Sequence, residues 1–160
     1  MATENKNLSD YDKSALPDAA SLRIGVVVSE WNSEITESLF SGAEEVLQDA
    51  GILPGNFLRW NVPGSFELVF GCKRMIEKHA PDAVIAIGSV IRGETQHFDY
   101  VCSAVAQGIK DLNIQYNIPV IFCVLTDDNL QQAKDRSGGK HGNKGTEAAV
   151  VALKMAVLGN

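Results

Sequence analysis

Short apolar runs alternate along this chain with longer segments in which apolar residues recur at helical spacing. The runs are rich in β-branched side chains, which is typical of strands buried on both faces of a sheet, and they cover residues 22–28, 57–62, 83–91 and 119–125. The helical pattern covers residues 33–50, 65–79, 97–116, a short stretch ending at 136, and 146–158. This alternation predicts an α/β three-layer sandwich: a four-stranded parallel sheet flanked by helices on both faces.

The first 21 residues differ from the rest in composition. They are polar and show no sustained periodicity, so we expect residues 1–21 to form a flexible arm and residues 22–160 to form a single domain. We expect a cytoplasmic protein, because the start of the chain lacks the pattern of a signal peptide and no segment is apolar enough to span a membrane. The net charge of −6 argues against nucleic acid as a partner.

Cysteines and basic residues limit the chemistry further. The three cysteines are far apart and form no C-x-x-C pair, so we expect reduced core thiols and neither a zinc site nor a redox motif. A basic cluster occupies one short segment and comprises Lys134, Arg136, Lys140, His141 and Lys144. It is consistent either with an anion site or with a solvated helix face and loop.

The segment GSVIRGET, Gly88 to Thr95, follows a predicted strand and precedes a helix. Its spacing approaches that of a nucleotide-binding P-loop, but Glu94 replaces the essential lysine, which excludes a nucleotide triphosphatase. Backbone N–H groups near the helix start could still bind a phosphate with help from Thr95. His97 begins the helix, where the helix dipole favours a neutral imidazole; it is a candidate proton shuttle or simply an exposed or capping residue.

Two further groups follow predicted strands. Trp31 and Asn32 follow the first strand, where an indole could stack on a planar ring or cover the edge of the core. Ser65, Phe66 and Glu67 begin a predicted helix; their polar groups suit a polyol, although Glu67 could simply favour the helix N-terminus. Ligands of parallel sheets bind beyond the carboxyl ends of the strands, where all these residues are expected.

Taken together, these segments resemble the lumazine synthase family. The most specific match is GSVIRGETQHFDYV over 88–101. The other matching segments, in order, are Trp31-Asn32, VPGSFEL over 62–68, PVIFCVLT over 119–126 and QQAKDRSGGKHGNKGTEAA over 131–149. Trp31 stands where phenylalanine is commoner in the family, and an indole stacks at least as well.

The resemblance implies a cofactor-free transferase of riboflavin biosynthesis. Such an enzyme condenses 5-amino-6-(D-ribitylamino)uracil with 3,4-dihydroxy-2-butanone 4-phosphate, giving 6,7-dimethyl-8-ribityllumazine, phosphate and water. By the same resemblance, Trp31 stacks on the pyrimidine, residues 65–67 contact the ribityl chain, and backbone groups of Ser89, Val90 and Ile91 contact the pyrimidine edge.

The resemblance also assigns residues to the phosphorylated substrate. Glu94 and Thr95 lie at its phosphate, His97 transfers protons, and Phe122 and Arg136 come from a neighbouring subunit, with Arg136 binding the phosphate. Lys144 and Glu147 are further candidates, and Glu147 is expected to orient Arg136.

Assembly follows from the resemblance as well. We expect a homo-oligomer: a pentamer with active sites between subunits, and a 60-subunit icosahedral capsid that could enclose riboflavin synthase. The N-terminal arm would extend a neighbour's sheet. The alternatives are a non-catalytic lumazine- or riboflavin-binding protein on the same scaffold and a less active decameric paralogue. A flavodoxin-like signalling domain is disfavoured because no acidic phosphoacceptor pocket is evident.

Overall fold

A computed structural model of the chain describes residues 7–159 and contains a four-stranded, fully parallel sheet in the order β2-β1-β3-β4. Its strands are β1 (Ile24–Ser29), β2 (Phe57–Val62), β3 (Ala83–Ile91) and β4 (Val120–Asp127). The helices are α1 (Ser33–Asp49), α2 (Leu68–His79), α3 (His97–Gln115), α4 (Leu130–Arg136) and α5 (Lys144–Ala156). Short 3-10 turns occur at Lys13–Ala15 and Pro54–Asn56, and a small hairpin joins β5 (Ser137–Gly139) to β6 (Gly142–Asn143).

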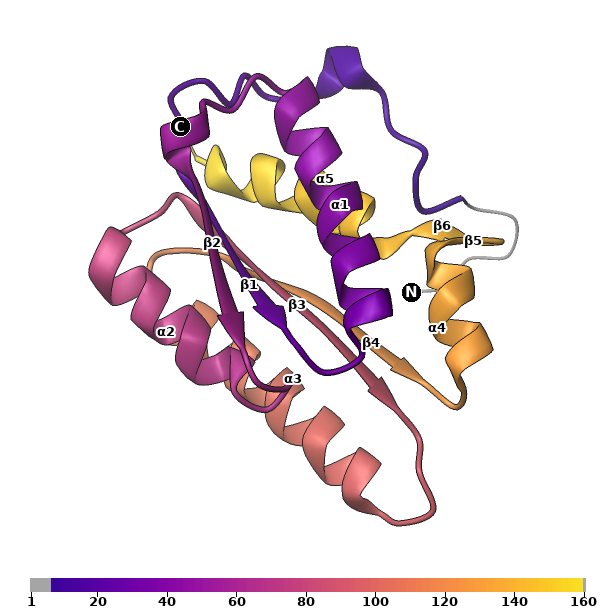
Figure 1. Ribbon diagram of the computed structural model, residues 1–160. Coiled ribbons are helices and arrows are strands. Elements are labelled where there is room, and N and C mark those ends of the chain that lie inside the picture. The colour runs from indigo at the N-terminus through magenta and orange to yellow at the C-terminus, as the bar shows by residue number, and fades with distance from the viewer. Residues whose placement is uncertain (1–6, 160) are drawn as a thin grey trace.

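The helices form layers on the two faces of the sheet, as Figure 1 shows. Helices α2 and α3 cover one face, and α1, α4 and α5 cover the other. Each connection between parallel strands must cross over the sheet, and a helix is the usual way to do so. The predicted three-layer α/β sandwich is therefore confirmed.

Alternating side chains of the central strands divide the core into two halves. Every residue of β1 is buried. Val26 and Val28 join the apolar cluster under α1 and α5, whereas Val27 joins the cluster under α2 and α3. This is the expected consequence of successive side chains pointing to opposite faces of a strand. Among residues 7–159, none of the helices combines the length and the apolar character needed to cross a membrane.

Some element boundaries differ from those predicted. Helix α2 begins at Leu68, so Ser65, Phe66 and Glu67 lie in the turn before it rather than in its first turn. The glycine-rich loop contains the β5–β6 hairpin, and α5 begins earlier than predicted, at Lys144, because the Asn143 side chain caps it by accepting a hydrogen bond from Gly145 N–H (2.8 Å).

The described part of the N-terminal arm, residues 7–21, contacts the domain of its own chain. The Leu8 backbone N–H donates to the His141 carbonyl (2.8 Å), the Tyr11 hydroxyl donates to Asp49, and Ala19 is fully buried. Burial of the ring, with the hydrogen bond to Asp49, raises the pKa of Tyr11 to about 12. The prediction of flexibility for residues 1–6 lies outside the described residues.

The cysteines confirm the predicted core thiols at two positions of three. Cys72 and Cys123 are buried and unbridged, and burial raises the pKa of both, that of Cys123 to about 12. Cys102 is only partly buried on α3, so the prediction that it is a core thiol is wrong.

Candidate functional site

The loops that follow β1 and β2 are joined by backbone hydrogen bonds at the carboxyl end of the sheet. Glu30 N–H donates to the Val62 carbonyl (2.8 Å), and Trp31 N–H donates to the Pro63 carbonyl (3.2 Å). These bonds continue the parallel β1–β2 pairing for two residues beyond the strands. They fix the backbone of Trp31 beside the turn that carries residues 64–67.

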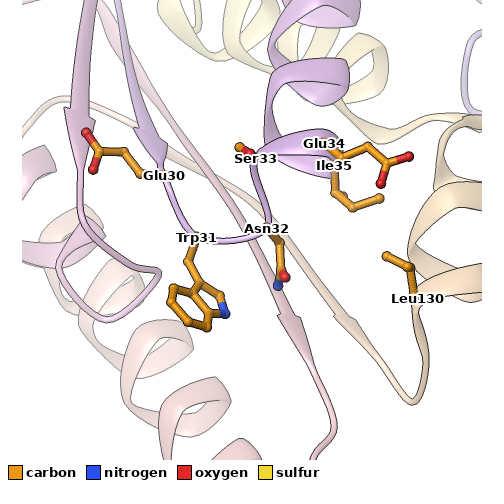
Figure 2. A pocket seen from close by; sticks show the side chains of 7 residues that line it. All are labelled: Glu30, Trp31, Asn32, Ser33, Glu34, Ile35 and Leu130. Carbon is orange, nitrogen blue, oxygen red and sulfur yellow. The ribbon is translucent and has the colours of Figure 1, made fainter.

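A pocket of about 410 Å³ opens at this edge, lined by residues 30–35 and by Leu130 from the start of α4. Figure 2 shows Trp31 and Asn32 projecting from the β1–α1 loop, with Leu130 across the pocket. The Trp31 side chain is 72% exposed. A large aromatic side chain left uncovered at a strand end provides an apolar face on which a planar ring can stack.

Asn32 connects two strand ends. Its backbone is left-handed (φ 58°), a conformation that asparagine tolerates better than most residues, and its side chain leaves the N-terminus of α1 uncapped. Instead, Asn32 Nδ2 donates to the Ser89 carbonyl on β3 (2.9 Å). One amide therefore fixes the Trp31 loop relative to the segment 89–91.

Ser65 and Glu67 pack against glycines. A Cβ atom at Gly88 would lie 2.7 Å from Ser65 Oγ, and one at Gly64 would lie 2.9 Å from Glu67 Oε2. A residue larger than glycine at position 88 or 64 would therefore take the space that the Ser65 or the Glu67 side chain occupies. Phe66 between them is 58% exposed. The turn offers a carboxylate beside an apolar ring, an arrangement that suits a polyol.

The loop after β3 is held by Arg92. Its Nε donates to Asp128 (3.0 Å), its two terminal nitrogens donate to Asp99 (3.3 Å each), and its guanidinium lies 4.1 Å from the centre of the Phe98 ring. Hydrogen bonds to Asp128 and Asp99 raise the pKa of Arg92. Arg92, at the start of the loop, is therefore bound both to the residue that follows β4 and to the first turn of α3.

His97 begins α3 directly after this loop and is exposed, as are Glu94 and Thr95. Its backbone N–H donates to Thr95 Oγ1 (3.4 Å). The imidazole is thus presented to solvent at the same edge of the sheet as Trp31 and the turn 64–67, where its two nitrogens can exchange protons with a bound molecule.

A second, smaller pocket of about 170 Å³ lies beside the end of β4. Its lining comprises Leu8, Val124, Leu125, Thr126, Asp127, Arg136 and Lys144, and it shares no residue with the first pocket. Arg136 Nη1 donates to the Gln132 carbonyl (3.0 Å), and Lys144 Nζ pairs with Glu147 (2.8 Å). Two cations at one cavity suit a small anion.

Comparison with known proteins assigns the chain to a family. Residues 21–160 match the family model described as 6,7-dimethyl-8-ribityllumazine synthase. The chain belongs to this family. Proteins named 6,7-dimethyl-8-ribityllumazine synthase from Flavobacterium johnsoniae and Christiangramia forsetii are 63% and 62% identical to it, over 99% of this chain and 83% and 95% of their own lengths. A protein of the same name from Parabacteroides distasonis is 56% identical, over 97% of both chains.

The residues expected from the lumazine synthase resemblance fall into two groups in one chain. The first group lies along the ends of β1, β2 and β3 and comprises Trp31, Ser65, Phe66, Glu67, Ser89, Val90, Ile91, Glu94, Thr95 and His97. The second lies on the β4 side. There Arg136 lines the second pocket. Phe122 lies on the edge strand β4, where its backbone pairs with Ala86 of β3, and its side chain is 39% exposed.

One expected contact differs. Glu147, which we expected to orient Arg136, pairs with Lys144 three residues earlier on α5. The carboxylate nearest to Arg136 is Asp127, whose Oδ1 lies 3.6 Å from Arg136 Nη1. Helical spacing brings Glu147 to Lys144, whereas Arg136 lies on a different helix, which turns back toward the end of β4.

Sequence reasoning missed Asp127 and Arg92. Asp127 is the last residue of β4 and is 5% exposed, and Arg92 follows the last residue of β3. The sign that could have revealed Asp127 is an acidic residue at the carboxyl end of an otherwise apolar strand, the position where ligands of parallel sheets bind. For Arg92 the sequence offered its place between a strand and a helix that carries Asp99 in its first turn.

Proposed function

We propose that this chain catalyses the condensation of 5-amino-6-(D-ribitylamino)uracil with 3,4-dihydroxy-2-butanone 4-phosphate. The supporting observation is membership of the 6,7-dimethyl-8-ribityllumazine synthase family over residues 21–160, together with a pocket at the strand ends that carries an exposed indole. The products are 6,7-dimethyl-8-ribityllumazine, inorganic phosphate and two water molecules.

The reaction divides into steps that each move a proton. The amine on the pyrimidine adds to the ketone, and the adduct loses water to form an imine. A proton then leaves the hydroxyl-bearing carbon as the phosphate departs, which gives an enol. The enol tautomerises to a ketone, and the ribityl-bearing nitrogen closes the ring on this ketone with loss of another water. Both substrates are intrinsically reactive, so much of the acceleration comes from holding them together in the right orientation.

The first group of residues would bind the pyrimidine substrate. Trp31 stacks on its ring, and the backbone of residues 89–91 binds its polar edge, whose position relative to Trp31 is set by Asn32. The turn 65–67 binds the ribityl chain, with the Glu67 carboxylate accepting hydrogen bonds from its hydroxyls.

The phosphorylated substrate would lie between subunits. Backbone groups of Glu94 and Thr95 bind its phosphate from one subunit, and Arg136 binds it from the neighbour with a planar fork of N–H donors. Phe122 of that neighbour covers the pyrimidine from the other side. His97 then lies beside the reacting atoms and transfers protons in successive steps.

This division of the site calls for assembly. We propose a homo-pentamer, and twelve pentamers in a 60-subunit capsid that could enclose riboflavin synthase, in the cytoplasm. Large apolar side chains exposed in the single chain support burial between subunits; they include Phe70, Tyr100, Ile114, Phe122, Val151, Met155 and Leu158. Strand addition by the N-terminal arm and the domain division at residue 22 remain predictions of the same scheme.

The test mixes purified protein with both substrates and follows absorbance of the lumazine product. We expect formation well above the spontaneous rate, near-complete loss in Arg136→Ala, and little change in Lys140→Ala, a matched removal of an exposed cation from the same segment. Product formation at the spontaneous rate, with the pyrimidine or riboflavin still bound, would instead identify a binding protein and overturn the proposal.

A further inference from the structure

Asp127 is a buried carboxyl group that the scheme above does not use. It ends β4 with 5% of its surface exposed, and its Oδ2 has neither solvent nor a hydrogen-bond partner among the described residues. Burying a carboxylate without a full set of partners is costly, and the cost falls when the group takes up a proton. Asp127 also lines the second pocket together with Arg136 and Lys144.

Its relation to Arg136 is electrostatic rather than a close hydrogen bond. The distance from Asp127 Oδ1 to Arg136 Nη1 is 3.6 Å, beyond the usual hydrogen-bond range, whereas Nη1 donates to the Gln132 carbonyl at 3.0 Å. The helix itself thus helps to hold the guanidinium in place. What Asp127 contributes is a negative charge beside it.

The other charged groups around Asp127 are already paired. Lys144 pairs with Glu147 at 2.8 Å, and Asp128 pairs with Arg92 at 3.0 Å; Arg92 also pairs with Asp99. Arg136 is the cation nearest to Asp127, and its pairing is the loose one. An anion that arrives at Arg136 therefore meets a buried carboxylate at the same guanidinium.

We propose that Asp127 is a positioning residue that acts through Arg136: it takes up a proton when a phosphate dianion binds there and releases it when the phosphate leaves. The inference rests on the proposed function, in which Arg136 binds phosphate. While ionised, Asp127 offsets the charge of Arg136; once protonated, it leaves that charge free for the anion, and its Oδ2 can carry the proton.

The electrostatics of the unliganded chain point the same way. Burial raises the pKa of Asp127, with Asp128 adding to the rise and Arg136 only partly offsetting it. A dianion nearby raises the pKa of a carboxyl group further, so the carboxyl group takes up its proton at a higher pH. Anion binding at Arg136 is then expected to strengthen as pH falls.

Inorganic sulfate is a suitable probe because, unlike phosphate, it stays a dianion from about pH 5 to about pH 8. We expect the Kd of the assembled protein for sulfate, measured by isothermal titration calorimetry, to rise several-fold across this range. Asp127→Asn keeps the shape of the side chain and removes the charge, so it should flatten this dependence and bind sulfate more tightly than the native protein at the upper end. Asp128→Asn is the matched control: it should keep a pH dependence of native steepness, displaced toward lower pH because Asp128 adds to the raised pKa of Asp127.

Proton uptake gives a readout that needs no change at Asp127. Titrations in two buffers of different ionisation enthalpy should show proton uptake on sulfate binding by the native protein and by His97→Asn. Absence of uptake in the native protein, or its loss in His97→Asn, overturns the role of Asp127, as does a native slope in Asp127→Asn. Arg136→Ala separates the two proposals: undiminished sulfate binding by that variant contradicts the phosphate site itself.

Discussion

The large side chains proposed to contact substrate are exposed in the single chain, whereas the serines of the same group are buried. Trp31 and Phe66 are 72% and 58% exposed, while Ser65 and Ser89 are buried. An exposed side chain contributes little to the stability of the chain, so its replacement separates function from folding. The same holds for His97, which lies on the surface at the start of α3.

Replacing His97 by alanine should therefore impair chemistry without unfolding the protein. We expect kcat to fall by roughly 10²-fold or more, which is the usual contribution of a positioned proton-transfer group. His79→Ala is the control, because His79 lies at the far end of α2 and packs edge-on against Trp60. Unchanged steady-state kinetics in His97→Ala, with native circular dichroism, would remove His97 from the mechanism.

Asp127 should also affect stability in a pH-dependent way. Its pKa in the folded chain is raised by burial, so the unfolded chain ionises first as pH rises, and native stability is lost between the unfolded and the folded pKa. Asp127→Asn cannot ionise. The free energy of unfolding of Asp127→Asn should therefore increase relative to that of the native protein as pH rises from about 4. Urea titrations at fixed protein concentration measure this difference. A difference in the free energy of unfolding between Asp127→Asn and the native protein that stays constant with pH would contradict the raised pKa of Asp127.

At the scale of elements, helices α1 and α5 approach so closely that only glycine fits at their contact. A Cβ at Gly145 would lie 1.8 Å from the Leu39 carbonyl oxygen, and one at Gly42 would lie 2.5 Å from the Asn143 side chain. Asn143 also donates to the Ser38 carbonyl (2.8 Å). This contact fixes the start of α5, and with it Lys144, against the rest of the domain.

Gly145→Ala should accordingly destabilise the protein. The added methyl group meets backbone, which cannot move aside without separating the helices, so we expect a loss of about 2–3 kcal/mol in the free energy of unfolding. Gly55→Ala is the matched control, since a Cβ there has no neighbour within 4 Å. Equal urea midpoints for the two variants would show that the α1–α5 contact can relax.

At the scale of the whole molecule, the residues of the proposed site fall into two separate groups within one chain. His97 and Trp31 belong to the group at the ends of β1, β2 and β3, while Arg136 lines a second pocket beside the edge strand β4. The two pockets share no lining residue. The proposed site needs both groups, and it would be completed if the β4 edge of one subunit lay against the strand ends of another.

Mixed oligomers test this arrangement directly. His97→Ala and Arg136→Ala should each be nearly inactive alone. When equal amounts of the two variants are denatured together and reassembled, the mixture should regain about one quarter of native activity. About one quarter of its interfaces then combine an intact His97 from one subunit with an intact Arg136 from the next. Sedimentation should show the same assembly in all samples. No recovery from correctly assembled mixtures would mean that each site lies within one chain.

The sequence by itself determined the layers of this fold and the positions of most candidate residues. Apolar runs that are buried on both faces and separated by amphipathic segments leave few alternatives to a parallel sheet between helices. Local patterns also located Trp31, residues 65–67 and His97, because each follows a strand or begins a helix. These inferences depend on neighbours in the chain, and such information is present in the sequence itself.

Only the tertiary structure decided which distant residues meet. The sequence did not reveal that Asn32 reaches Ser89, that Lys144 rather than Arg136 pairs with Glu147, or that Asp127 is buried beside Arg136. Residues 127 and 136 lie on different elements, and their distance depends on the angle at which α4 turns back onto the sheet. That angle results from packing across the whole domain, and the burial that alters the pKa of Asp127 results from the same packing.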